Sequence, residues 1–145
     1  MTRLNDFMAC PELAPIYNYC LSNGTPAKYT KGQSFVDEGS LCRYIAVVRS
    51  GYFKFSVIDN NGDECTTGFS FAGDIVADYV CSFLNTQPSP TSIVAGADSE
   101  VLRVSAGELR TYLDKADSEY IARTAKLLLK EVYRRYIDMH RFSPE

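Results

Sequence analysis

Short runs of β-branched and aromatic residues alternate with turn residues from residue 27 to residue 105, and this pattern limits the fold more than any other feature of the chain. The run 52–58 alternates apolar and polar side chains, as a strand with one buried face requires. The Asn-Gly pair within 59–63 tolerates positive φ and predicts a hairpin turn after that strand. About eight short strands fit the region, and their close spacing indicates a β-sandwich or closed barrel. A parallel α/β sheet is not indicated, because it would need crossover helices between the strands.

Helices are predicted on both sides of the strand region. Upstream, apolar residues recur near helical spacing over 4–22, and prolines divide this segment into a short helix or turn and a second helix from Pro11 to about Asn23. Downstream, Ser105 and Glu108 have the spacing of a capping box, which predicts a helix over 106–113. The fold class is therefore mainly β with flanking helices.

The longest uninterrupted element is a helix predicted from Glu119 to Phe142, a stretch without Gly or Pro. At a rise of 1.5 Å per residue it is about 35 Å long. Its apolar residues recur at alternating spacings of four and three, as in a coiled-coil seam with one polar member: Ile121, Ala125, Leu128, Val132, Arg135, Met139 and Phe142. The seam predicts a homodimer interface, because it continues beyond what one small barrel covers. The alternative is a helix packed wholly on its own barrel.

Metal and nucleophile chemistry find little support in the sequence. His140 is the only histidine, so a metal site with two or three histidines cannot form within one chain. The chain has five cysteines: Cys10, Cys20, Cys42, Cys65 and Cys81. No two of them form a C-x-x-C pair, and we interpret them as reduced thiols that pack as small hydrophobic residues. A redox or iron–sulfur role is the alternative. We expect no metal, no cofactor and no enzymatic activity.

Charge and hydropathy point to a cytoplasmic protein. The 15 basic and 18 acidic residues give a formal net charge of −3, so the chain as a whole lacks the basic character of a nucleic-acid-binding domain. No run of 18 apolar residues is present to span a membrane. The first residues lack the apolar core of a signal peptide. We therefore expect no membrane partner.

Four motifs follow one another in the strand region. Residues 31–39 fit K-G-x-x-φ-x-x-x-G, residues 44–51 fit φ-x-φ-φ-x-x-G, residues 71–75 contain G-D-φ, and residues 98–104 form a final strand. In this order and spacing they resemble the CRP/FNR-type transcription regulators, whose sensor domain is the cyclic-nucleotide-binding β-roll. The resemblance covers about residues 5–142.

The resemblance implies a jelly roll, or double-stranded β-helix, with N-terminal helices and a long C-terminal dimerisation helix. It implies an effector-sensing domain that acts as a homodimer and reaches DNA only through a helix-turn-helix domain after Glu145. A stand-alone small-molecule-binding β-roll without DNA binding is the alternative. A cupin-type enzyme shares the roll, but it needs a histidine-rich metal site that this sequence lacks.

Two parts are therefore predicted. Residues 1–116 form the β-roll sensor domain with its N-terminal helices, and residues 117–145 form the long helix and the start of a linker. Residues 1–120 carry a net charge of −6 and residues 121–145 a net charge of +3, which suits the approach to a basic neighbouring domain. A solvated helix face explains the same charge bias.

The phosphate cassette of the family departs from its pattern here. The family has G-E-φ and later R-[ST]-A, in which the Glu holds the ribose and the Arg pairs with the cyclic phosphate. This sequence has Ala77-Asp78-Tyr79, and Thr91 stands at the position of the Arg. No Lys or Arg occurs from residue 55 to residue 102. An anion would lose a charge-assisted pair of about 1.5–3 kcal/mol, so we predict no tight binding of cAMP or cGMP.

The cassette loop still predicts a small polar pocket for an unknown effector. Its candidate ligand-binding side chains are Asp78, Tyr79, Ser82, Thr91 and Ser92. The apolar walls are expected from Phe55, Phe69 and Phe83. The alternative is a roll filled by its own aromatic side chains, because small barrels are often packed solid.

Overall fold

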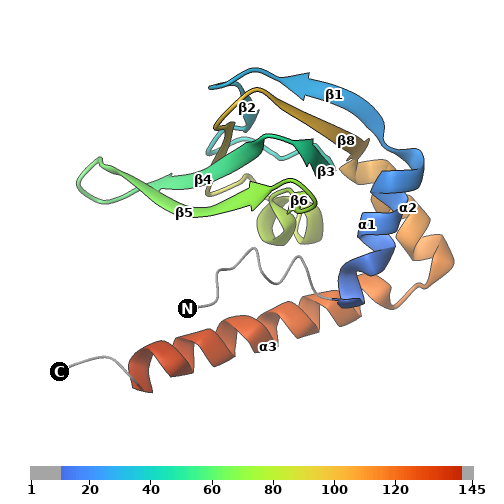
Figure 1. Ribbon diagram of the computed structural model, residues 1–145. Coiled ribbons are helices and arrows are strands. Elements are labelled where there is room, and N and C mark those ends of the chain that lie inside the picture. Colours follow the sequence, from blue (N-terminus) through green and yellow to red (C-terminus); the bar gives the residue numbers. More distant parts are fainter. Residues whose placement is uncertain (1–10, 142–145) are drawn as a thin grey trace.

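The computed structural model describes residues 11–141, and eight strands with flanking helices make up this part of the chain (Figure 1). The elements are η2 (Pro11–Leu13), α1 (Ala14–Asn23), β1 (Thr25–Tyr29), β2 (Ser34–Val36), β3 (Tyr44–Ser50), β4 (Tyr52–Ile58), β5 (Glu64–Phe71), β6 (Ile75–Val76), η3 (Tyr79–Leu84), β7 (Ser92–Ala95), β8 (Ser99–Ser105), α2 (Ala106–Ala116) and α3 (Tyr120–Arg141). The predicted fold class and element order are confirmed. The short helix expected before residue 11 lies outside the described residues.

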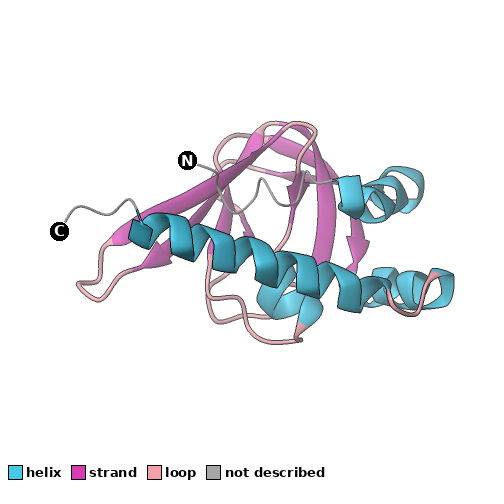
Figure 2. Cartoon of the chain, turned by 90° about the horizontal axis from the view of Figure 1, so that it is seen from below, coloured by secondary structure: helices cyan, strands magenta, loops and turns pink. Residues whose placement is uncertain are grey.

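The strands form two four-stranded antiparallel sheets that face each other in a β-roll (Figure 2). One sheet has the order β1-β8-β3-β6 and the other the order β2-β7-β4-β5. The predicted hairpin joins β4 to β5. Gly62 has φ of 85° there, and the Asp59 carboxylate accepts hydrogen bonds from the backbone N–H groups of Asn61 and Asp63, both at 2.9 Å. Those two bonds lower the pKa of Asp59, together with other backbone contacts in the turn.

The inner face of the roll is filled by aromatic rings and small apolar side chains. Phe53 is fully buried, and its ring lies 5.4 Å from that of Tyr29 and 5.8 Å from that of Phe35, both edge to face. The rings of Tyr29 and Phe35 are 5.7 Å apart. Edge-to-face rings at these separations attract each other beyond their burial. This cluster joins β1 of one sheet to β2 and β4 of the other.

The outer face of the sheet β1-β8-β3-β6 is covered by helices. Strand β3 shows the arrangement, because all four residues from Ile45 to Val48 are buried. Ala46 and Val48 pack inside the roll, and Ile45 and Val47 pack against the helices. The helix-side cluster also includes Ile75, Ala77 and Val104, and every helical element contributes to it: Leu13, Ile16, Cys20, Tyr79, Phe83, Leu109, Leu113, Tyr120 and Leu128.

The C-terminal helices begin largely where the sequence predicts. The Ser105 side chain accepts from Glu108 N–H at 3.1 Å, and the Glu108 carboxylate accepts from Ser105 N–H at 3.3 Å, which confirms the capping box. Helix α2 continues to Ala116, three residues beyond the predicted end. The carboxylate of Asp117 accepts from Glu119 N–H at 3.1 Å in the turn before α3. Helix α3 then crosses the underside of the roll in both views (Figures 1 and 2).

The inner cluster predicts a large difference between two substitutions on one strand. Phe53→Ala is expected to lower the free energy of unfolding by about 3–5 kcal/mol, because it leaves a cavity among packed rings. Ile58→Ala is the control, since Ile58 on the same strand is 55% exposed and its truncation is expected to cost about 0.5 kcal/mol or less. Urea unfolding measures both, and equal losses for the two variants would contradict the packed interior.

Candidate functional site

The cassette is the segment 77–91, which links β6 to β7 and contains η3. Helix η3 is a six-residue π-helix, a rare form that is often found at functional sites. Asp78 caps it, because its carboxylate accepts from Ser82 N–H at 3.0 Å. Thr86 follows with φ of 53°, a left-handed conformation that non-glycine residues seldom adopt. The cassette is therefore a locally constrained segment built around the Asp78 cap.

Ser82 ties the cassette to the roll. Its side chain is buried, accepts from Cys42 N–H at 2.9 Å and donates to the carbonyl of Gln87 at 3.0 Å. The same segment gains two backbone bonds, from Gln87 N–H to the Cys81 carbonyl and from Thr86 N–H to the Ser82 carbonyl. The hydroxyl predicted to face a ligand thus already has both a donor and an acceptor within the protein.

Residues 89–92 are held against the loop before β3. The Ser92 hydroxyl accepts from Glu38 N–H at 3.1 Å. Buried Ser89 donates to the Thr91 carbonyl at 2.7 Å and accepts from Thr91 N–H at 3.2 Å. Backbone bonds from Gly39 N–H to the Ser89 carbonyl and from Ser89 N–H to the Ser40 carbonyl complete the contact. Thr91 and Ser92 therefore lie in a region whose polar groups are largely paired internally.

Tyr79 lies on the other side of the cassette helix. Its side chain is buried among the helices, and its hydroxyl donates to Thr124 Oγ1 on α3 at 2.8 Å. The ring stacks on that of Phe83, with centroids 5.3 Å apart and planes 17° apart. Burial raises the pKa of Tyr79, so this hydroxyl stays protonated and can donate. The structure thus brings Asp78 and Ser82 together but turns Tyr79 away from them.

The three predicted wall residues also separate. Phe83 belongs to the helix-side cluster, and half-buried Phe55 packs against the inner cluster. Phe69 lies on the outer face of its sheet, where its ring stacks on Phe71 at 5.7 Å and lies 6.2 Å from that of Tyr52. These three phenylalanines therefore do not share one wall. Two-residue alternation along β5 gives Phe69 the face opposite to that of buried Ser70.

The basic residues nearest the cassette in sequence have other partners. Lys54 pairs with Glu64 at 2.8 Å across the β4–β5 hairpin. Arg103 lies 4.1 Å above the ring of Tyr44 and donates to the Tyr29 hydroxyl at 2.9 Å. Within residues 11–141, half-buried Asp78 forms no ion pair, and the same part of the chain holds no group of three metal-ligating side chains. Arg110 on α2 lies 4.9 Å from the Phe83 ring, on the helix side of η3. On the side of Asp78 and Ser82, an anion would meet hydroxyls, amides and a carboxylate.

The predicted seam of the long helix divides into two parts. Leu128 is buried in the helix-side cluster, Ile121 packs against that cluster, and Ala125 is half-buried. Val132 is exposed, whereas the side chains of Arg135 and Met139 and all of Phe142 lie outside what the structure describes. The seam divides in this way because a different face of the helix packs on the roll. Tyr120, Thr124 and Leu128 are spaced by four and share the face that packs on the roll.

A second apolar stripe, rotated from the predicted seam, lies on the exposed part of α3. Its large side chains are strongly exposed: Leu129 (70%), Val132 (45%), Tyr133 (64%) and Tyr136 (53%). They follow i, i+3, i+4 and i+7 spacing, which places them on one helix face. An open groove of about 580 Å³ runs along the same half of the helix, with Leu127, Tyr133 and Ile137 among its lining residues. Nothing in the sequence pattern alone distinguishes this stripe from the predicted seam.

Fold and cassette together define a β-roll of the kind that holds cyclic nucleotides. The sequence matches the model of the cyclic nucleotide-binding domain family over residues 26–116, which is more than half of the chain. The chain therefore belongs to this family, and the resemblance noted from its motifs is confirmed. No curated protein sequence is a match.

Solved structures share the fold. The catabolite activator protein of Thermus thermophilus matches with a TM-score of 0.69 and 22% identity, over 92% of this chain and 60% of that chain. The N-terminal domain of a transcriptional regulator from Streptomyces coelicolor A3(2) matches with a TM-score of 0.60 and 18% identity, over 97% and 95% of the two chains.

A third structure, the c-di-GMP-responsive global regulator CLP of Xanthomonas campestris, has a TM-score of 0.62 and 15% identity, over 89% of this chain and 61% of that chain. The present chain thus spans about three fifths of the length of this regulator and of the Thermus thermophilus protein. No helix within residues 11–141 is long and apolar enough to cross a lipid bilayer.

The packing around the cassette predicts which thiols react. The thiolate is the nucleophile, and burial raises the pKa of Cys20 to about 12 and also raises that of Cys42 below the cassette. At about pH 8 we expect iodoacetamide to label exposed Cys65 at least about tenfold faster than either, as followed by peptide mass spectrometry. Cys65→Ser removes the fast site and serves as the control. Equal labelling of Cys42 and Cys65 in the folded protein would show that the cassette is open.

Proposed function

We propose that this chain is the effector-sensing and dimerisation domain of a CRP/FNR-like transcription regulator, cytoplasmic and without enzymatic activity. Membership in the cyclic nucleotide-binding domain family supports a sensing role. Two of the similar structures are a catabolite activator protein and the N-terminal domain of a transcriptional regulator, which supports a regulatory context. DNA contact is assigned to a helix-turn-helix domain after Glu145, as the resemblance implies.

The observation that carries the ligand part of the proposal is the absence of a cation in the cassette segment. Residues 55–102 contain no Lys or Arg, and Thr91 stands at the position where the family pattern has Arg. Asp78 adds a negative charge to the same segment, and the hydroxyls of Ser82 and Ser92 are already engaged. A cyclic phosphate would exchange its hydration for few favourable contacts. The effector is therefore not a tightly bound cAMP or cGMP.

The dimerisation part of the proposal rests on the exposed stripe of α3. Leu129, Val132, Tyr133 and Tyr136 form one apolar face that projects from the packed half of the helix. A contiguous exposed apolar face of this kind marks an interaction surface. Two antiparallel or parallel copies of the same helix face satisfy a two-fold axis without any further element. We assign the homodimer interface to this stripe, with Val132 shared between it and the predicted seam.

The lack of a cation in the cassette segment predicts that a basic residue at position 91 increases the affinity for cAMP. Thr91→Arg is expected to raise the affinity for cAMP at least about tenfold, because it restores a charge-assisted partner for the phosphate. Thr91→Gln introduces a longer polar side chain without charge and is expected to give no gain. Calorimetric titration of the three proteins with cAMP measures the effect. Micromolar binding by the unsubstituted chain, or no gain from Thr91→Arg, would contradict the proposal.

The stripe predicts a change of oligomeric state. Leu129→Glu is expected to raise the dimer dissociation constant at least about tenfold, because a buried leucine contributes about 1.5–3 kcal/mol and each dimer loses two. Lys115→Glu changes the charge of an exposed residue on α2 and is expected to have no effect. Sedimentation equilibrium gives both constants. A monomeric unsubstituted chain would refute the assignment.

A further inference from the structure

Two buried hydroxyls join the cassette helix to the long helix. Tyr79 on η3 is 4% exposed and Thr124 on α3 is 2% exposed. Tyr79 donates to Thr124 Oγ1 at 2.8 Å, and Thr124 donates onward to the Ile121 carbonyl at 2.9 Å. The result is a short relay of hydrogen bonds from the cassette side chain to the backbone of α3. Hydroxyls this deeply buried have no water to replace a lost partner.

The ring of Tyr79 is held as firmly as its hydroxyl. It stacks on Phe83 one turn further along η3, and Phe83 is almost fully buried. The guanidinium of Arg110 on α2 lies over the Phe83 ring, 4.9 Å from its centroid. Helix η3 is thus packed against both C-terminal helices. Because interiors are close-packed, η3 cannot turn without displacing Tyr79 from α3.

The opposite side of the same helix carries the candidate site. Asp78 caps η3, and Ser82 links it to Cys42 and Gln87 on the polar side of the cassette. Any rearrangement of these bonds changes the position of a helix that is only six residues long. One short helix therefore has the candidate site on one side and the hydroxyl relay on the other.

We infer that the Tyr79–Thr124 hydrogen bond is the contact through which a rearrangement of the cassette changes α3. This inference rests on the proposed function in taking α3 as the output element. The structure shows the pair bonded, and its separation would leave a buried Tyr hydroxyl without an acceptor. Tyr120 also donates from α3, to the Glu12 carbonyl at 2.6 Å, but that bond leads to η2 and bypasses the cassette.

Amide chemical shifts of the full chain test the relay without any ligand. Asp78→Ala removes the cap of η3 and is introduced into the unsubstituted chain and into the double variant Tyr79→Phe/Thr124→Val. The double variant keeps the stacked ring and the branched shape but removes both hydroxyls. We expect Asp78→Ala to shift the amide resonances of η3 in both backgrounds. In the double variant its shifts at residues 120–125 are expected to be at least about threefold smaller.

A third background, Tyr120→Phe, tests whether the effect on α3 passes through Tyr79 and Thr124. In Tyr120→Phe, which removes the other buried hydroxyl of α3, Asp78→Ala is expected to shift residues 120–125 as much as in the unsubstituted chain. Equal shifts at 120–125 in the double variant and the unsubstituted chain would overturn the inference. So would no shift at 120–125 in any background. Because the experiment needs neither an effector nor a dimer, its outcome is separate from that of the proposed function.

Discussion

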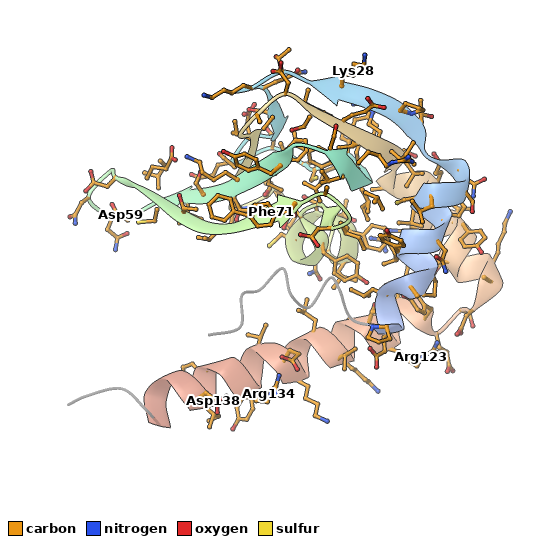
Figure 3. All side chains as sticks on the ribbon, in the orientation of Figure 1. Lys28, Asp59, Phe71, Arg123, Arg134 and Asp138 are labelled. Atoms are coloured by element: carbon orange, nitrogen blue, oxygen red, sulfur yellow. The ribbon has the colours of Figure 1, made fainter. Side chains whose placement is uncertain are left out.

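Burial of both faces of the sheet β1-β8-β3-β6 is the constraint on which the rest of the structure depends. A strand such as β3, with four consecutive buried residues, is stable only if each face has its own cover. The second sheet covers one face, and α1, η3, α2 and the first part of α3 cover the other. The cassette helix is therefore a structural member of the helix-side core as well as part of the candidate site. Figure 3 shows the side chains filling the space between the roll and these helices.

This double role explains why the cassette has polar groups on one side and aromatic rings on the other. Its hydroxyls and backbone groups hold η3 against the roll, and its aromatic rings hold it against α2 and α3. A ligand that enters must replace some of these internal bonds. An anion gains too little from doing so, because residues 55–102 carry no cation. The long helix divides accordingly, with a first half fixed by the roll and a second half that presents Leu129, Val132, Tyr133 and Tyr136.

Local sequence signals predicted most of the fold. The Asn-Gly hairpin and the Ser105–Glu108 capping box depend on neighbouring residues, so they can be predicted from the sequence. The alternation expected along residues 52–58 ends at Phe55, because the pairing of β4 with β5 shifts register between Phe55 and Ser56, and Ser56 is buried in place of Val57. The element against which each side chain packs could not be predicted. Tyr79 turns toward α3, and Leu128 packs on the chain's own core, because distant segments meet there. A heptad spacing identifies an apolar helix face but does not say which of two adjacent faces the roll already covers.

Hydrogen exchange of the amides of α3, measured on the full chain at low and high protein concentration, tests the division of this helix most directly. Amides 120–128 are expected to exchange at the same rate at both concentrations, since the roll protects them within one subunit. Amides 129–141 are predicted to slow as the concentration rises and a second copy covers the exposed stripe. Protection that is uniform along α3 and independent of concentration would contradict the division of this helix into a half packed on the roll and a half that pairs with a second copy.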